Sequence, residues 1–382
     1  MEESIKSNNL PFKFKGDIYL LAMTILLIGL GILVVYSSVS ARAVSSVKST
    51  ESIFIEHVIM LAIGVVTMIA CYKINYKWYG ILSLPLLIIS LILMVLVSIP
   101  GIGKEINQAS RWLVIPVVNR SFQPSDLAKI AVIIYLTSSL SKLQNSTGDF
   151  SQILMKAVGL PLIVIVLIAL NDVSTAILLT LIVGVIMYIG RVESRVFLSF
   201  LGVLIACFPF IYYLSNRTRT AIGRVTDFFR FSDEPGVTEL TYQAEQSHIA
   251  IALGGINGVG LGHSQQRYFL PEAFSDYIYA IIIEEHGLKF GLAILLIYLG
   301  VLYRGMKITQ RTDNAFSGLL VVGMCTLIVF QAMIHMAVVT GVGPVTGLPL
   351  PWVSMGGTSL LFTGMAFGII MSVSKEYQNE LN

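Results

Sequence analysis

The sequence predicts an all-α polytopic membrane protein with about ten transmembrane helices. Composition supports this prediction, because 55% of the residues are apolar and only 12% are charged, whereas a soluble domain carries about 25% charged residues. A second observation is the length of the apolar runs, several of which reach the roughly 20 residues that a helix needs to cross a bilayer. The formal net charge of +3 is too small to indicate a nucleic-acid partner.

Ten apolar runs are candidates for membrane spans. The fifth and sixth are separated only by the polar residues 171–175, where we expect a hairpin. The first run is longer than the apolar core of a signal peptide, about 7–15 residues, so we expect it to remain as an anchor. The ten runs lie near 18–41, 54–72, 78–100, 122–141, 155–171, 173–190, 196–214, 276–303, 315–338 and 357–374.

Lysine and arginine residues in the short connections predict the orientation of these spans. With the N-terminus in the cytoplasm, the cytoplasmic connections hold most of these residues, as the positive-inside rule requires. Ten spans then place both termini in the cytoplasm. We expect a single transmembrane domain over 1–382, in which the long connection 215–275, between spans seven and eight, is an extracytoplasmic loop of short amphipathic helices and glycine turns.

The stretch 341–359, between the last two predicted spans, is uncharged and rich in glycine and proline. Irregular backbone cannot face lipid, because its amide groups would lack hydrogen-bond partners. We therefore expect this stretch to be buried in protein or to line a water-filled cavity.

Two opposite charges lie near the start of the fourth predicted span, where an ionisable group costs at least about 2.5 kcal/mol. Asp126 and Lys129 are three residues apart and share a helix face. They form either a self-neutralising pair that fixes helix packing or a polar wall of a substrate cavity. Pro124, just before them, suits the start of a helix.

The eighth predicted span carries three carboxylates. Asp276 lies where loop becomes helix near the outer surface, so it is either an N-cap or first-turn acid or a functional carboxylate. Glu284 and Glu285 lie deeper, and we interpret them as structural. Lys289, four residues beyond Glu285, is the expected ion-pair partner.

Four motifs resemble the SEDS family (shape, elongation, division and sporulation), which includes the FtsW and RodA proteins. With the ten spans, the likeness covers nearly the whole chain in order, and the forms "SFQPSDLAK" and "VSMGGTS" are more similar to division-type than to elongation-type members. The four motifs are "INQASRWLVIPVVNRSFQPSDLAK", "NDVSTA", "TYQAEQSHIAIALGGINGVGLGHSQQRYFLPEAFSDYIYAIIIEEHG" and "GPVTGLPLPWVSMGGTSLL".

The resemblance implies a peptidoglycan glycosyltransferase in the bacterial cytoplasmic (inner) membrane, working at the division septum. Such enzymes polymerise the lipid-linked precursor lipid II into β-1,4 glycan strands on the outer face of the membrane. They work with a class B penicillin-binding protein, which is a transpeptidase, and with other membrane proteins of the division machinery. The family's motif PE-x-x-(S/T)-D-(F/Y) implies that Asp276 is the essential carboxylate.

The resemblance also implies a mechanism. The family forms a β-linkage from an α-linked donor, so the anomeric centre inverts and one base suffices. Asp276 would take the proton from the acceptor 4-hydroxyl as it attacks, and the pyrophosphate would leave without being protonated.

The departing pyrophosphate needs cations, and Arg224 matches the family's basic position in "GRVTDFF". Guanidinium groups suit bidentate phosphate contacts. A divalent cation, Mg²⁺ or Mn²⁺, could serve instead with Asp276 as a ligand, and the sequence leaves the metal open. Besides Asp276, the candidate substrate-binding residues are Arg224, Lys129, Asp126, Arg111, Gln243, Gln246, Ser247, Glu272 and Ser354.

The chain departs from the commoner family pattern at three positions. Asp126 stands where many members have Glu, and His335 stands where many have Asn; both keep a polar side chain. Phe274 stands where many members have His, so no histidine next to Asp276 belongs in the mechanism.

Two other functions stay open at this point. A flippase that moves lipid II would need polar groups through the depth of the membrane, whereas a polymerase needs them at one face. Most polar features of the chain fall at the predicted outer face, which favours the polymerase, and Glu284, Glu285 and Lys289 are the evidence against it. An elongation-type polymerase is the second alternative.

Overall fold

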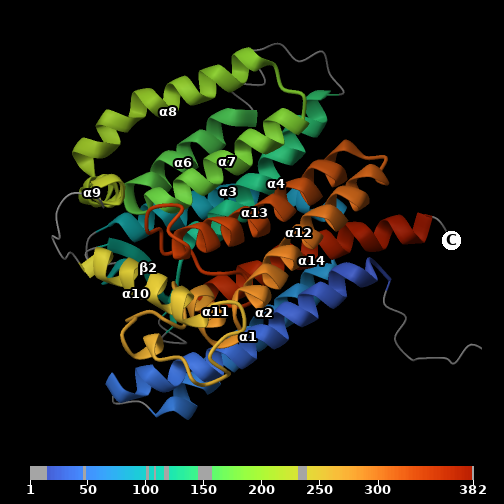
Figure 1. Cartoon of the computed structure of the whole chain (residues 1–382). Coiled ribbons are helices and arrows are strands. Elements are labelled where there is room, and N and C mark those ends of the chain that lie inside the picture. Colours follow the sequence, from blue (N-terminus) through green and yellow to red (C-terminus); the bar gives the residue numbers. More distant parts are fainter. Residues whose placement is uncertain are drawn as a thin grey trace, which may run out of the picture.

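The computed structural model describes residues 15–45, 49–99, 103–106, 109–115, 120–144, 157–230 and 239–380, which form a bundle of helices (Figure 1). The helices are α1 (Ile18–Ser45), α2 (Thr50–Lys73), α3 (Tyr76–Ser98), α4 (Pro124–Gln144), α6 (Gly159–Asn171), α7 (Val173–Ile189), α8 (Ser194–Leu214), α9 (Asn216–Arg230), α10 (Glu239–Gly254), α11 (Ile278–His286), α12 (Leu288–Gln310), α13 (Ala315–Val339) and α14 (Gly357–Glu380).

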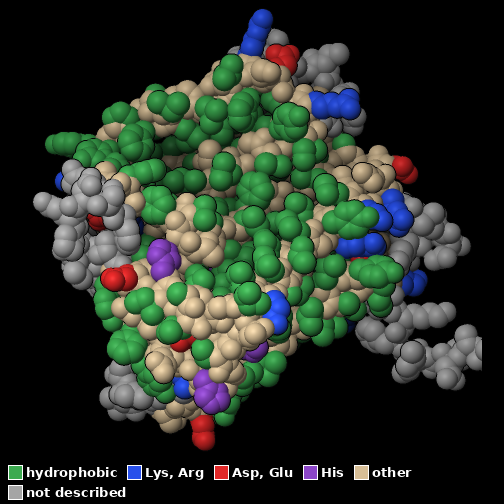
Figure 2. Space-filling model, viewed as in Figure 1, with side chains coloured by type: hydrophobic (Ala, Val, Ile, Leu, Met, Phe, Trp, Pro, Cys, Tyr) green, Lys and Arg blue, Asp and Glu red, His purple; other side chains and the backbone are tan. Residues whose placement is uncertain are grey.

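Seven of the described helices are long and apolar enough to cross a membrane: α1, α2, α3, α8, α12, α13 and α14. The protein is therefore a multi-pass membrane protein. Large apolar side chains cover the middle of the face seen in Figure 2, and charged side chains lie mostly toward its edges, as expected for a surface in contact with lipid. The helices α4, α6 and α7 fall outside this group of seven, so the count of ten spans stays a prediction.

The expected hairpin near 171–175 is confirmed. Helix α6 ends at Asn171 and α7 begins at Val173, and Asp172 between them is the N-cap of α7. The Asp172 side chain accepts a hydrogen bond from the Thr175 N–H at 3.2 Å. A short polar side chain at this position satisfies an amide that the first turn of a helix leaves without a partner.

The all-α prediction is incomplete, because three strands join α3 to α4. The strands β1 (Gly103–Ile106), β2 (Ala109–Ile115) and β3 (Arg120–Phe122) form an antiparallel sheet in the order β1-β2-β3. Leu113 of β2 is opposite Gly103 of β1 and Phe122 of β3. The run "ASRWLVI" is rich in residues that favour strands, and the all-α prediction did not take this signal into account.

The prediction of one continuous helix over 276–303 is wrong. Helix α11 ends at His286 and α12 begins at Leu288, with Gly287 between them at φ 82°. A side chain at Gly287 would place its Cβ 2.2 Å from the Ile256 carbonyl oxygen. The Leu288 N–H donates to the Gly255 carbonyl at 2.9 Å, so the loop after α10 packs into the break between the two helices.

Glycines let α2 and α14 lie very close together. A Cβ on Gly364 would come 2.1 Å from the Gly64 carbonyl oxygen, and a Cβ on Gly368 would come 2.4 Å from that of Met68. Small residues at helix contacts are typical of membrane proteins, since they allow close backbone approach. Helix α13 lies in the middle of the bundle (Figure 1), and most of its side chains are buried.

The connection 215–275 contains short helices and glycine turns, and its place outside the membrane stays a prediction. Within it the structure contains the amphipathic helix α9, helix α10, a series of glycine turns and a short 3-10 helix over Gln266–Tyr268. Helices α9 and α10 and strand β2 lie at the same end of the bundle (Figure 1).

Candidate functional site

Asp276 lies in a turn that leads into α11. The Glu272 carbonyl accepts hydrogen bonds from the N–H groups of Ser275 and Asp276, both at 3.0 Å, which fixes this turn. The N-cap of α11 is Tyr277, and its side chain makes no capping hydrogen bond. Asp276 is half-buried and precedes the cap, so the interpretation of this carboxylate as an N-cap is wrong.

The irregular segment after α13, residues 341–356, packs over this turn. Its buried residues include Leu348, Leu350 and Trp352, so the prediction that this stretch is buried in protein is confirmed. The Trp352 backbone has φ 65°, an unfavourable region for a non-glycine residue, and its ring packs beside Phe367 at 6.0 Å between centroids.

Side chains from two helices hold the second half of this segment. On α13, Gln331 Nε2 donates a hydrogen bond to the Pro349 carbonyl at 2.8 Å. His335 Nδ1 is hydrogen-bonded to the Leu348 carbonyl, also at 2.8 Å. The Tyr298 hydroxyl of α12 donates to the Pro351 carbonyl at 2.5 Å. This part of the segment is therefore anchored to the core of the bundle.

Ser354 joins the segment to the Asp276 turn. Its hydroxyl accepts from the Leu350 N–H and donates to the Ser275 carbonyl, both at 2.8 Å. The Met355 N–H donates to the Phe274 carbonyl at 2.9 Å. Ser354, predicted to bind substrate, is buried and makes these two contacts with the protein.

The Asp276 carboxylate faces the first half of the segment. A narrow niche beside it is lined by Asp276, Tyr277, His335, Val338, Val345, Thr346, Gly347 and Leu348. A Cβ on Gly347, which has φ 69°, would lie 3.3 Å from Asp276 Oδ2. Glycine at this position therefore lets the backbone approach the carboxylate closely.

A larger cavity of about 220 Å³ adjoins this niche. Val338 and Val345 line both spaces. The cavity lies between α9, α10 and the start of the segment, and it is mainly apolar. Its lining residues are Arg224, Asp227, Phe228, Ala244, His248, Val338, Gly341, Gly343, Pro344 and Val345.

Arg224 and Asp276 lie on two sides of the same backbone segment. Arg224 Nη1 donates to the Val345 carbonyl at 3.3 Å, and Asp276 lines the niche at Val345–Leu348. Burial raises the pKa of the Tyr277 hydroxyl, which lies before α11; the Asp276 charge raises it further and the Arg224 charge lowers it. Asp276 lines the niche and Arg224 lines the cavity, and the two spaces share Val338 and Val345 as walls.

Asp126 and Lys129 form the predicted pair. Lys129 Nζ lies 2.8 Å from Asp126 Oδ1, both side chains are buried, and α4 begins at Pro124 as expected. Lys129 Nζ also donates to Gln331 Oε1 at 3.4 Å. These residues line a separate small space below the segment, so the structure does not bring them into the cavity with Arg224.

The other predicted residues lie around the cavity. Ser247 is buried, and its hydroxyl donates to the Val339 carbonyl at 2.8 Å. Gln243 and Gln246 are half-buried on α10, but Ala244 and His248 line the cavity from that helix. Glu272 is exposed at the start of the Asp276 turn. Arg111 belongs to β2, and its side chain lies outside the part of the chain that the structure describes.

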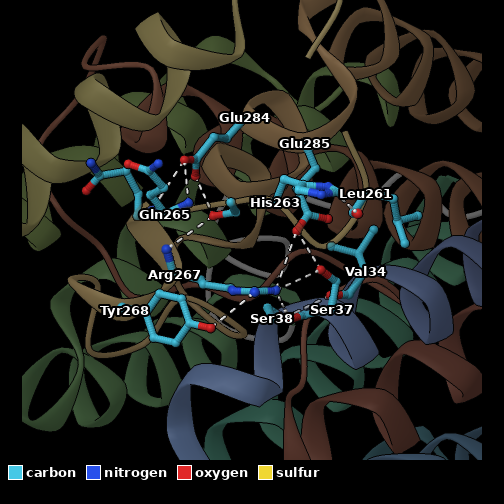
Figure 3. Close-up of polar contacts among 12 residues, drawn as sticks. Val34, Ser37, Ser38, Leu261, His263, Gln265, Arg267, Tyr268, Glu284 and Glu285 are labelled. Atoms are coloured by element: carbon cyan, nitrogen blue, oxygen red, sulfur yellow. Dashed lines mark hydrogen bonds and ion pairs between the residues drawn. The ribbon is translucent and has the colours of Figure 1, made fainter. Parts of the chain in front are cut away.

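Glu284 and Glu285 hold the loop that follows α10 rather than pairing with Lys289 (Figure 3). Glu284 accepts from the Ser264 hydroxyl at 2.5 Å and from the Gln265 N–H at 2.9 Å. Glu285 accepts from the Ser37 hydroxyl of α1 at 2.5 Å, with Arg267 Nη1 4.0 Å away.

The predicted partner of Glu285 is therefore wrong. Lys289 Nζ donates to Asn257 Oδ1 at 2.7 Å instead. The break at Gly287 explains the error, since i,i+4 spacing brings side chains together only along an unbroken helix.

Sequence reasoning overlooked the role of Gln331 and saw His335 only as a departure from the family pattern. The two residues are four apart on a span with few polar residues, so they share a helix face, and an irregular segment follows them in the chain. A helix face with two polar side chains before a stretch of irregular backbone was the signal available, because that backbone needs hydrogen-bond partners.

Comparison with known proteins gives consistent likenesses. A profile of the FtsW, RodA and SpoVE family, described as "Cell cycle protein", matches residues 18–379. The chain is 34% identical over 372 residues to a probable peptidoglycan glycosyltransferase FtsW of Trichlorobacter lovleyi, covering 95% of this chain and 94% of that protein. It is 32% identical to stage V sporulation protein E of Bacillus subtilis, covering 95% of this chain and 98% of that protein.

Solved structures share the fold. A chain of a peptidoglycan synthase complex, described in terms of polymerization and crosslinking, superposes with a TM-score of 0.73 at 23% identity, over 95% of this chain and 98% of that chain. The rod shape determining protein RodA of Thermus thermophilus superposes with a TM-score of 0.68 at 21% identity, over 94% of this chain and 97% of that chain.

Proposed function

Since the chain belongs to the FtsW/RodA/SpoVE family, the SEDS family that its motifs resemble, we propose that it is a peptidoglycan glycosyltransferase of the division type. It polymerises lipid II into β-1,4 glycan strands at the outer face of the bacterial cytoplasmic membrane, at the division septum. The names of the curated relatives at 32–34% identity support the division type over the elongation type.

The observation that carries the proposal is the meeting of Asp276 and Arg224 at a mainly apolar cavity. A lipid-linked pyrophosphate sugar needs a base for the attacking hydroxyl, a cation for the phosphates and an apolar surface for the lipid. Asp276 and Arg224 lie at the Val345 backbone, and Phe228, Pro344 and Val345 give the cavity apolar walls.

The reaction on this site is a single displacement. The 4-hydroxyl of one substrate attacks the anomeric carbon of the other, and its proton passes to the Asp276 carboxylate. The bond from the anomeric carbon to the phosphate oxygen breaks, and the pyrophosphate leaves with the electron pair. Arg224 stabilises the negative charge on the departing group, which a guanidinium does well through two parallel hydrogen bonds.

A divalent cation is a weaker fit to these residues. Among the described residues, no three His, Cys, Asp or Glu side chains converge as metal ligands, so Asp276 would act with few protein ligands. An Mg²⁺ or Mn²⁺ ion would then be held mainly by the phosphates, as is usual for magnesium.

The topology that suits this function has ten spans with both termini in the cytoplasm. The seven long apolar helices would be joined by α4, α6 and α7. Helices α6 and α7 have 13 and 17 residues, which is short for a bilayer core of about 30 Å. The outer face would then carry α9, α10, β2 and the Asp276 turn.

A class B penicillin-binding protein is the expected partner, together with other membrane proteins of the division machinery. The structural likeness to a chain of a peptidoglycan synthase complex supports a partner of this kind, because that complex is described by polymerization and crosslinking. Glycan strands made at the outer face would pass directly to a transpeptidase.

Transport of lipid II across the membrane is the competing function. The observation that favours it is the buried Asp126–Lys129 pair, a polar feature separate from the Asp276 site. The pair is neutral as a unit and makes its contacts with Gln331, which suits a role in helix packing as well.

The experiment is polymer synthesis by the full-length protein in lipid vesicles, with its transpeptidase partner and lipid II. We expect glycan chains from the wild type and none from Asp276→Asn, which keeps the size of the side chain but cannot take a proton. Asp313→Asn, in the exposed connection between α12 and α13, is the matched control and should polymerise normally. Normal polymerisation by Asp276→Asn would refute the base, and lipid II movement without polymer would favour the transporter.

A further inference from the structure

Two buried polar atoms beside Asp276 have no hydrogen-bond partner among the residues that the structure describes. They are the Tyr277 hydroxyl and His335 Nε2, on side chains that are each 1% exposed. Most buried polar groups in proteins are paired, because an unpaired one loses its hydration without compensation. Both side chains line the same niche as the Asp276 carboxylate, so the two unpaired atoms and the proposed base share one space.

The contact of His335 with the segment fixes which nitrogen is an acceptor. Nδ1 lies 2.8 Å from the Leu348 carbonyl oxygen, which can only accept, so Nδ1 carries the proton and donates. A neutral imidazole then has a lone pair at Nε2. The niche therefore offers an acceptor at His335 and a hydroxyl that can donate at Tyr277.

The niche is too narrow to hold a water molecule as it stands. A partner can enter only when one wall moves, and the wall best able to move is 343–347. A Cβ added at Gly343 would meet no atom within 4 Å, and this short stretch is held at the Val345 carbonyl by Arg224. The neighbouring stretch from Leu348 to Ser354 is anchored to α12 and α13 instead.

We propose that Tyr277 and His335 form a binding site for a sugar hydroxyl of the substrate, entered when residues 343–347 shift. The hydroxyl accepts from the Tyr277 O–H and donates to His335 Nε2, which satisfies both atoms at once. This places the sugar in a fixed orientation beside the Asp276 carboxylate. The inference rests on the proposed function and names two substrate-binding residues for it.

The site depends on the residue at 335. An Asn amide can reach the position of Nδ1 and donate to the Leu348 carbonyl, but it has no atom at the position of Nε2. His335→Asn therefore keeps the anchor of the segment and removes the proposed acceptor.

The test is a double-mutant cycle on the full-length protein with its transpeptidase partner, using lipid II as the substrate. The variants are Tyr277→Phe, His335→Asn and the two combined. Tyr279→Phe, two residues along and outside the niche, is the matched control. The readouts are kcat/KM for polymer formation and the thermal midpoint Tm of each variant.

We expect each single variant to lower kcat/KM about tenfold, as loss of one substrate hydrogen bond does. The combined variant should lose less than the product of the two single losses, since both atoms hold the same hydroxyl. Tyr277→Phe should keep or raise Tm, because it removes an unpaired buried hydroxyl.

Wild-type rates in both single variants would overturn the site and leave the polymerase standing. A lower kcat/KM in variants that also have a lower Tm would overturn the site too, because it would show that these residues have a structural role. Failure of the wild type to polymerise lipid II would refute the proposed function and this site with it.

Discussion

Gln331 and His335, one turn apart on α13, hold two consecutive carbonyl groups of the segment that covers Asp276. Gln331 donates to Pro349 and His335 to Leu348, both at 2.8 Å. Gln331 also accepts from Lys129, which pairs with Asp126 on α4. The buried ion pair and the Asp276 turn are therefore joined through one helix and one stretch of irregular backbone.

This arrangement predicts that Gln331→Leu will destabilise the protein. The change keeps an apolar volume but leaves the Pro349 carbonyl without its donor and removes one of the two acceptors of Lys129, the other being Asp126. A buried polar group that loses its partner costs about 1–3 kcal/mol. Thermal unfolding of the purified protein measures the loss. Gln310→Leu, exposed at the end of α12, is the control and should unfold with the wild type; equal midpoints for both variants would contradict the role of Gln331.

Arg224→Ala should weaken the binding of lipid II and also slow the chemical step, because the guanidinium is proposed to stabilise the charge on the departing pyrophosphate. The guanidinium lies at the Val345 carbonyl on the wall of the cavity, where a phosphate of lipid II would meet it. Losing a charged hydrogen bond of about 1.5 kcal/mol raises KM about tenfold. The KM of Arg224→Lys should lie between those of the wild type and Arg224→Ala, since lysine keeps the charge but not the planar pair of donors.

The control for Arg224 is Arg219→Ala on the same helix. Arg219 donates to the Tyr213 carbonyl at 3.0 Å and lies over the Tyr212 ring, away from the cavity. Its loss should leave KM for lipid II unchanged. Equal effects of the two alanine variants would mean that α9 contributes general positive charge rather than one phosphate ligand.

Gly364→Ala should destabilise the bundle although alanine favours helices. The new Cβ would lie 2.1 Å from the Gly64 carbonyl oxygen, so α2 and α14 would have to separate. Overpacking of this kind costs about 1–3 kcal/mol. Gly202→Ala on α8 has open space around the new Cβ and should keep or raise Tm, because alanine is the better helix former. A Tm for Gly364→Ala at or above that of the wild type would show that the helices have room to adjust.

The sequence predicted those features that depend on composition and local pattern. Apolar runs located the long helices, Asp172 marked the hairpin, and the spacing of Asp126 and Lys129 predicted their ion pair. Local patterns failed where a distant segment decides the conformation. Gly287 breaks the predicted eighth helix because residues 255–258 pack against it, and no pattern around Gly287 itself reveals that contact.

The candidate site also combines features that the sequence predicted with features that depend on contacts between distant segments. The resemblance to the family implied roles for Asp276 and Arg224, but their meeting at Val345 depends on how α9 and the segment after α13 pack. Gln331 and His335 were harder to predict, since a polar residue on a buried helix has many possible partners. Only the path of the irregular backbone shows which carbonyl groups they serve.

Arg267 and Glu285 give the last prediction, which concerns how the loop between α10 and α11 is held. Glu285 is buried, and Arg267 Nη1 lies 4.0 Å from it and 3.0 Å from the Ser37 carbonyl of α1 (Figure 3). Arg267→Ala should cost about 1–3 kcal/mol, because the buried carboxylate loses its nearby positive charge. Adding Glu285→Gln should recover part of that loss, since the neutral amide needs no counter-charge and can still accept from Ser37. Thermal midpoints of the two single variants and the double variant measure the coupling, and purely additive losses would contradict an interaction between these residues.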